Sequence, residues 1–235
     1  AGFLIDKISL SFTLYFSFGA YVLHNLLMLL LINKGQKNDL SKELQIIKSI
    51  KYIFNLNIIR HLFIIMLAIA ILIFGLETLS PVIAKDIFNT GPTGFGILLS
   101  SAGFGMAVAS LTVASLKSIN INKLLTISIA GGGLTLIAFA FSPNYLVGIM
   151  LFAVLFSLAA SSESAITTMI QTSVPDNMRG KVISIQTFTW GISSLTGILS
   201  GYISEQFGIT LLIFISGIIL FTLTPITRLI AKETK

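Results

Sequence analysis

Seven long segments that are almost free of charged side chains limit how this chain can fold. A helix needs about 20 mostly apolar residues to cross about 30 Å of hydrocarbon. In these segments the apolar character runs around the whole helix rather than along one stripe, which is typical of a helix surrounded by lipid. We therefore predict an all-α membrane protein whose seven transmembrane helices are Ile8–Ile32, Ile58–Ala84, Gly94–Leu116, Leu124–Ser142, Leu146–Ile170, Val182–Ile203 and Gly208–Ile230.

The composition agrees with a surface that faces lipid. Charged residues make up 10% of the chain and hydrophobic residues 54%, whereas a water-soluble domain carries about 25% charged residues. The chain has no cysteine, which excludes disulfides, thiolate metal sites and thiol catalysis. The net charge of +6 does not indicate a nucleic-acid partner, because the basic residues lie in the short connections between spans. We expect the lipid bilayer as a partner, and neither a metal nor a cofactor.

The basic residues also predict an orientation. If the segment after the first span lies in the cytoplasm and the spans alternate, thirteen lysines and arginines fall inside and only Lys7 and Lys85 fall outside. This is the bias that the positive-inside rule describes, and it places the C-terminus in the cytoplasm. The thirteen are Lys34, Lys37, Lys42, Lys48, Lys51, Arg60, Lys117, Lys123, Arg179, Lys181, Arg228, Lys232 and Lys235.

Residues 34–57 form the one sizeable connection. Their apolar residues recur at steps of three and four, which predicts an amphipathic helix along the cytoplasmic membrane surface. A passive linker is the alternative. The chain opens at Ala1-Gly2-Phe3 without methionine, and we expect it to be part of a longer protein. The apolar positions of the linker are Leu40, Leu44, Ile47, Ile50 and Phe54.

Three stretches resemble a known transporter family. They are Ser49–Arg60 (SIKYIFNLNIIR), Gly91–Ser100 (GPTGFGILLS) and Gln171–Val182 (QTSVPDNMRGKV), the last followed by Gly197 and Gly201. The chain is similar here to the enterobactin-exporter and macrolide-efflux branch of the major facilitator superfamily.

Members of that superfamily have two six-helix halves, and the resemblance implies how this chain divides. Residues 1–33 would end the first half with its last helix, residues 34–57 would be the cytoplasmic linker, and residues 58–235 would form the second half. The missing first half would then be a partner. The resemblance also implies a bacterial cell membrane and the export of amphipathic small molecules such as drugs or siderophores.

Two acidic side chains lie within predicted spans, and they are the first candidates for a functional site. Glu163 and Glu77 are expensive to place near the centre of a membrane helix. Because burial favours the neutral form of a carboxyl group, each could take up and release a proton. We predict that Glu163, Ser162 and Gln186 line a central cavity, with Glu77 as a further candidate. The alternative for Glu163 is a structural acid held by neighbouring serines, and Glu77 could simply reach water near the membrane surface.

A turn before the sixth span is the candidate for a conformational role. Pro175 and Gly180 are expected to frame it, with Asp176, Arg179 and Lys181 nearby. Arg179 could bond the carbonyl groups that end the preceding helix and pair with an acid across the loop. Such contacts would hold one state closed on the inside, whereas simple positive-inside anchoring is the alternative.

Small residues predict where helices pack closely. Ser193, Gly197 and Gly201 recur every four residues on one face, and Gly103 with Ala107 does so on another. The triplet at 131–133 is expected to bend its span.

The sequence therefore favours a secondary active transporter that exports amphipathic molecules in exchange for protons by alternating access. A truncated half-transporter without independent activity is an alternative, and a seven-helix receptor or sensor is a weaker one. No lysine lies deep in a late span, as a retinal protein requires, and no clustered histidines or paired acids indicate an enzyme.

Overall fold

The computed structural model describes residues 10–31, 56–116 and 119–233, and in these ranges it contains helices and no strands. Six helical runs are long and apolar enough to cross a membrane, and a shorter apolar stretch, Leu14–Met28, lies in the first helix. The predicted all-α membrane fold is thus confirmed. The elements are α2 (Leu10–Leu31), α4 (Asn57–Ile69), η1 (Ala70–Phe74), α5 (Gly75–Thr78), α6 (Ser80–Val82), η2 (Ile83–Ile87), α7 (Pro92–Ser115), α8 (Ile121–Ala140), α9 (Tyr145–Ser173), α10 (Asp176–Phe207), α11 (Ile209–Thr222) and α12 (Thr224–Glu233).

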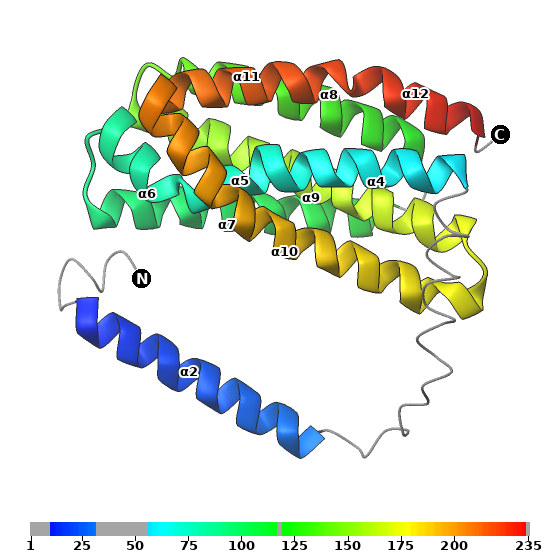
Figure 1. Ribbon diagram of the computed structural model, residues 1–235, viewed down its shortest axis with the longest axis horizontal. Helices are drawn as coiled ribbons and strands as arrows, with labels where there is room; N and C mark the ends of the chain where they lie inside the picture. The colour runs from blue at the N-terminus through cyan, green and yellow to red at the C-terminus, as the bar shows by residue number, and fades with distance from the viewer. Residues whose placement is uncertain (1–9, 32–55, 117–118, 234–235) are drawn as a thin grey trace.

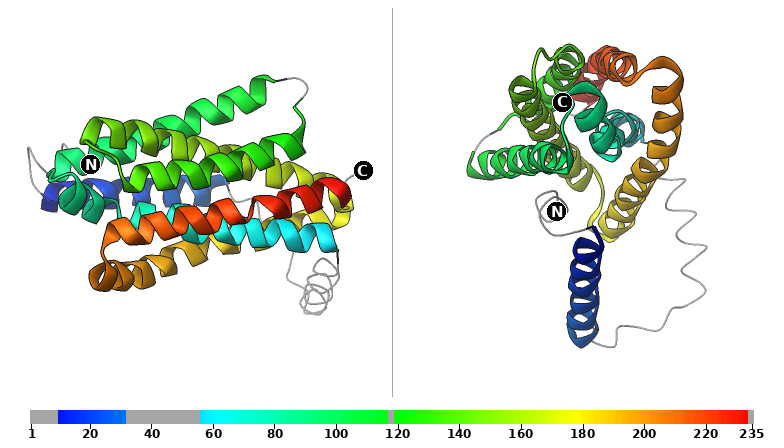
Figure 2. Two further views of the ribbon diagram at one scale, coloured as in Figure 1. Left: turned by 90° about the horizontal axis from the view of Figure 1, so that it is seen from above. Right: turned by 90° about the vertical axis from the view of Figure 1, so that its left-hand side faces the viewer.

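The helices from α4 onward pack into one bundle, and α2 lies apart from it (Figures 1 and 2). All the side chains that the structure describes in α2 are exposed. The amphipathic helix predicted for residues 34–57 falls almost wholly outside the described residues, so it stays a prediction.

Successive membrane-spanning runs of the bundle go in opposite directions (Figure 1); α4, η1 and α5 form one such run, and α11 and α12 form another. The start of α4, the turn between α9 and α10 and the end of α12 therefore lie at the same end of the bundle. We call this the basic end, because Arg60, Lys123, Arg179 and Arg228 lie there. Lys85 lies at the opposite end, within η2, as the alternation of spans predicts.

The first helical run of the bundle is irregular. It passes from α4 through the π-helical turn η1 into α5, and it is interrupted at Leu79. Pro81 lacks the amide hydrogen that would bond the carbonyl group four residues earlier, at Glu77. The hydroxyl of Ser80 donates to that carbonyl instead. The chain can therefore continue as a helix past the proline without leaving this polar group unpaired.

Glycines allow two close helix crossings. A Cβ atom on Gly133 of α8 would lie 2.7 Å from the amide nitrogen of Phe221, and one on Gly217 of α11 would lie 2.9 Å from the carbonyl oxygen of Gly133. A Cβ on Gly105 of α7 would overlap the carbonyl of Ala153 on α9.

The triplet at 131–133 lies inside α8, which continues through it, and it packs closely: Gly131 faces Leu158 of α9, whereas Gly132 and Gly133 face α11. The bend expected there stays a prediction.

The four predicted packing positions divide into two pairs. Gly197 approaches Thr78, and Ser193 lies half-buried beside α4 and η1. Gly103 and Gly201 have no atom within 4 Å of an added Cβ, so the described chain makes no close contact there. On α7 the close contact is made by Gly105, which points to a different side of the helix from Gly103 because successive residues are turned by about 100°.

Candidate functional site

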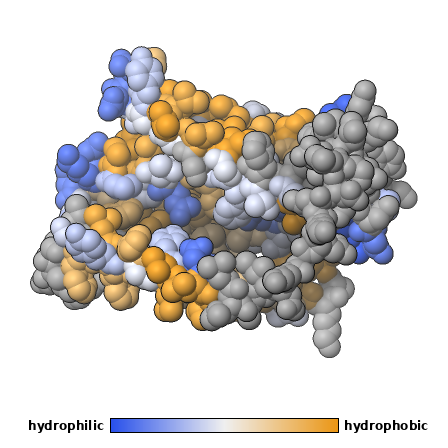
Figure 3. Space-filling model, turned by 60° about the horizontal axis from the view of Figure 1, so that its bottom comes forward, coloured by the Kyte–Doolittle hydropathy of each residue, from blue (hydrophilic) through white to orange (hydrophobic). Residues whose placement is uncertain are grey.

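A groove of about 860 Å³ runs between α7, α9 and α10. In the space-filling view, hydrophilic side chains lie in a hollow that is bounded by hydrophobic ones (Figure 3). The walls are formed by Met106 and Ser110 of α7, by Ala160, Glu163, Ser164, Thr167, Thr168 and Gln171 of α9, and by Ile183, Gln186, Thr187 and Trp190 of α10.

The spacing along α9 places its polar side chains on the groove. Residues four apart lie above one another on a helix. Glu163, Thr167 and Gln171 form one such row. On α10, Gln186 and Trp190 lie four apart and face this row. The groove is therefore polar because a row of polar side chains on α9 faces Gln186 and Trp190 on α10.

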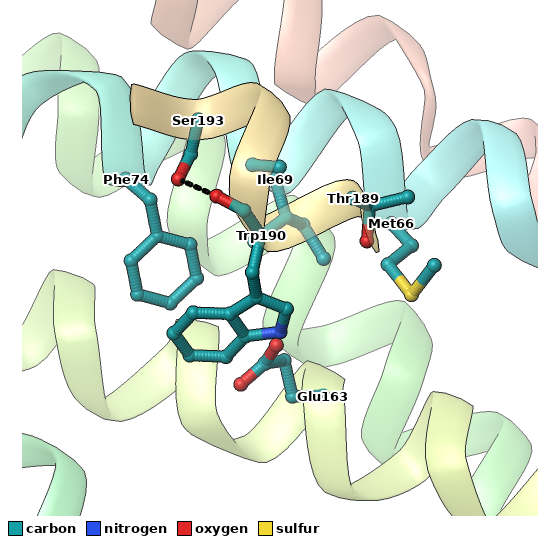
Figure 4. Close-up of a pocket in the computed structure, with 8 residues that line it drawn as sticks. Met66, Ile69, Phe74, Glu163, Thr189, Trp190 and Ser193 are labelled. Atoms are coloured by element: carbon teal, nitrogen blue, oxygen red, sulfur yellow. Dashed lines mark hydrogen bonds between the residues drawn. The ribbon is translucent and has the colours of Figure 1, made fainter. Parts of the chain in front are cut away.

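Glu163 is the only charged residue among the described residues that line the groove. The indole nitrogen of Trp190 lies beside its carboxylate, in a position to donate to it (Figure 4). Figure 4 shows the indole nitrogen directed toward the carboxyl group. Because a carboxylate can accept several hydrogen bonds, this single donor leaves further lone pairs for a ligand or a proton.

The carboxyl group also borders a second, much smaller space on the far side of Trp190 (Figure 4). That pocket holds about 10 Å³, which is close to the smallest volume that accommodates one water molecule. Its walls are mainly apolar. They comprise Met66, Ile69, Ala70, Phe74, Thr189, Trp190 and Ser193 as well as Glu163.

A row of aromatic rings supports Trp190 from behind. Its ring centroid lies 4.9 Å from that of Phe74 in η1. Phe74 meets Phe156 edge to face at 5.8 Å, and Phe156 contacts Phe152 at 4.8 Å. Phe152 continues to Phe139 of α8 at 5.4 Å. Such ring pairs contribute about 0.5–1.5 kcal/mol each beyond their buried area, so the indole has a well-supported position.

Gln186 joins the two helical walls. Its side-chain amide donates to the hydroxyl of Thr167 at 2.7 Å. The structure thus brings Gln186 and Glu163 to the same groove, as the sequence predicts.

Ser162 and Glu77 do not line this groove. Ser162 is 1% exposed, and its hydroxyl donates to the carbonyls of Leu158 and Ala159 on its own helix. It follows that Ser162 points into the bundle, about 100° around α9 from Glu163, and its predicted place in the cavity is corrected. Glu77 is half-buried in α5 and lines neither the groove nor the small pocket.

Arg179 bonds the end of the preceding helix as expected, but its acidic partner lies three residues earlier in its own helix rather than across the loop. Its Nε donates to the carbonyl of Gln171 at 2.9 Å, and its guanidinium pairs with Asp176 at 2.7 Å. The expected turn is shorter than Pro175 to Gly180, because Pro175 precedes the first residue of α10 and Gly180 lies inside that helix. Lys181 also lies in α10, but its side chain is outside the described part of the structure.

Most residues that line the groove were not predicted from the sequence. Trp190, Thr167, Gln171, Ser164 and Met106 were not among the predicted residues. The row of polar residues at steps of four along α9 was a usable signal. The contribution of Trp190 had no such signal, because it depends on how α10 crosses α9.

No curated protein and no solved structure matches the chain. The sequence model of a family of transporters of the major facilitator type, described as transmembrane secretion effectors, matches residues 25–232. This match begins within α2 and extends through α12. A multi-pass membrane fold, the polar groove and the family match agree, and the chain belongs to the transmembrane secretion effector family of major-facilitator transporters.

Proposed function

We propose that the chain exports amphipathic small molecules from a bacterial cell and exchanges them for protons. The observation that carries the proposal is Glu163, the single charged residue among the described residues that line a polar groove between membrane helices. An acidic side chain in such a place is costly, which favours a functional reason for its presence. The family match supports a transport role.

Glu163 is the proposed proton carrier. The carboxyl group borders both the open groove and the small pocket, so it can be reached from the groove while its other side stays among apolar residues. In alternating access, a proton on this group and a molecule in the groove would favour different states of the transporter. Gln171 and Arg179, which are joined at the basic end, would stabilise the state that is closed toward the cytoplasm.

The groove has walls from three helices of the described bundle and is open on its remaining side. We propose that the first half of the transporter supplies the facing wall. In this arrangement the basic end and the C-terminus lie in the cytoplasm of the cell, in agreement with the positive-inside rule.

The test is efflux from bacteria that express the complete transporter. Three fluorescent probes cover the possible charges: ethidium is cationic, Nile red is neutral and anilinonaphthalene sulfonate is anionic. Extrusion of at least one probe should depend on the transporter and stop when a protonophore collapses the gradient. Glu163→Gln should abolish this extrusion while the protein still reaches the membrane.

Glu205→Gln is the matched control, because Glu205 is exposed near the other end of α10. It should extrude the probe at the normal rate. Gradient-driven efflux that continues unchanged in Glu163→Gln would remove Glu163 from the mechanism.

A further inference from the structure

We infer that the groove selects amphipathic molecules that carry one positive charge, and that Glu163 and Trp190 together hold the cationic group. This inference rests on the proposed export function and names the class of molecule that would be exported. It is carried by three features of the groove: its single charge, the exposed indole, and the direction in which its hydroxyl groups donate.

The first feature is charge. Glu163 is the only charged residue among the described lining residues, and none of these residues is basic. The described basic residue closest along α10 is Arg179, which is bonded to Gln171 and Asp176 at the basic end. A cation in the groove would therefore meet an opposite charge. An anion would meet a like charge with no basic partner, and burying it there would be costly.

The second feature is the position of Trp190. Its side chain is 45% exposed and borders the groove, although Phe74 supports its ring. The indole N–H is directed to Glu163, whose carboxylate lies beside the ring (Figure 4). A cation near an indole face is attracted by the ring, most strongly at sites from which water is excluded. The carboxylate and the ring thus attract the same kind of group.

The third feature is the set of hydroxyl groups. Four of them donate their hydrogen to a carbonyl of their own helix: Ser110 to Met106, Ser164 to Ala160, Thr168 to Ser164 and Thr187 to Ile183. A hydroxyl has one hydrogen to donate and two lone pairs that accept. With its hydrogen used in the helix, each hydroxyl offers only acceptor lone pairs to the groove.

Gln186 uses one of its two amide N–H groups in a bond to the Thr167 hydroxyl, and the amides of Gln186 and Gln171, like the indole of Trp190, are lining groups that carry N–H donors. The four hydroxyls above therefore add acceptors for an ammonium or another N–H donor, alongside the charge on Glu163.

Protons should compete with the cation, because only the ionised carboxylate attracts it. The groups that face Glu163 from the other helices do not change their charge with pH. They are Met66 and Ile69 of α4, Ala70 and Phe74 of η1, and Met106 and Ser110 of α7. On α10, Gln186, Thr189, Trp190 and Ser193 are likewise neutral. Glu163 is thus the only titrating group at the site within the described residues.

The groove volume lies within the range of about 300–1,000 Å³ that is usual for small-molecule sites. Tetraphenylphosphonium and tetraphenylborate are suitable probes, because they have nearly the same shape and opposite charge. Equilibrium binding of each would be measured with the complete transporter in lipid nanodiscs. The binding to empty nanodiscs of the same lipid would be subtracted.

We expect saturable binding of tetraphenylphosphonium that weakens as the pH falls. Glu163→Gln should reduce the affinity at least tenfold and remove the pH dependence. Trp190→Leu should reduce it at least threefold, whereas Trp190→Phe should retain most of it, because a ring face remains. Glu205→Gln should bind as the unaltered protein does. Circular dichroism and size-exclusion chromatography would show that each variant is folded.

Binding of tetraphenylborate as tight as that of tetraphenylphosphonium would overturn the inference, and so would unchanged phosphonium binding in Glu163→Gln. The outcome is separate from that of the efflux test. Efflux of Nile red or of the sulfonate probe without phosphonium binding would leave the exporter in place and remove the cation site. Glu163-dependent phosphonium binding without efflux of any probe would keep the cation site and contradict the proposed export.

Discussion

The Gln186 side-chain amide on α10 lies 2.7 Å from the Thr167 hydroxyl on α9, one helical turn from Glu163 on the basic-end side. This hydrogen bond crosses between the two helices that provide most of the polar groove. It uses one of the two amide hydrogens of Gln186, while the Glu163 carboxylate lies beside the indole of Trp190 (Figure 4). The contact therefore ties α9 to α10 close to the Glu163 carboxylate.

Removing either partner of this hydrogen bond should lower the stability of the transporter. In a double-mutant cycle with Gln186→Leu and Thr167→Val, we expect an interaction free energy of about 0.6 kcal/mol, the average for hydrogen bonds between membrane helices. Reversible unfolding in mixed micelles would measure it. Strictly additive effects of the two changes would show that the bond contributes nothing to stability.

The crossing of α8 and α11 predicts a strong dependence on glycine size. A Cβ at Gly217 would lie 2.8 Å from the side chain of Ile137 and 2.9 Å from the carbonyl of Gly133. Gly217→Ala should therefore cost about 1–3 kcal/mol, as overpacking usually does. Gly201→Ala is the control, because no atom lies within 4 Å of its added Cβ. Thermal unfolding followed by size-exclusion chromatography should separate the two; equal melting temperatures would contradict the crossing.

Arg179 tests whether the contacts at the basic end affect motion or stability. The ion pair with Asp176 is exposed, and such pairs contribute about 0–1 kcal/mol. We expect Arg179→Ala to change the melting temperature little and to slow efflux clearly, because the bond to the Gln171 carbonyl is also lost. Asp176→Asn keeps that bond and should have a smaller effect. Normal efflux by Arg179→Ala would leave Arg179 only an anchoring role.

The absence of cysteine makes the orientation easy to test. Asn89 and Asn120 lie at opposite ends of α7, in short connections. In intact cells, a membrane-impermeant maleimide should label Asn89→Cys, whereas Asn120→Cys should react only after the cells are permeabilised. If both variants were labelled from the same side, the assignment of α7 as a span would be wrong.

The helices were predicted well because the apolar character of a membrane span is visible in the residues of that span alone. The predicted span Gly94–Leu116 coincides with α7 to within two residues at its start and one at its end. The family resemblance also held at the level of the major facilitator type, and the family match includes the motif from Gln171 to Val182. These features depend on local sequence, so a single chain is enough to find them.

The faces of the helices were harder to predict. Glu163 and Ser162 are neighbours in the sequence, yet one borders the groove and the other is buried against the bundle. A helix that is apolar on all sides gives little indication of which side meets protein and which meets lipid. For the same reason Gly103 looked like a packing position, whereas Gly105 makes the contact with α9.

The π-helical turn at Ala70–Phe74 has a consequence for how relatives of this chain should be aligned. A π-helical turn contains one residue more than an α-helical turn, so it shifts the facing of every later residue by roughly 100°. A relative with a regular helix here would need a gap of one position between Ala70 and Phe74. Without that gap, every side chain after the turn would be matched to one on the wrong side of the helix.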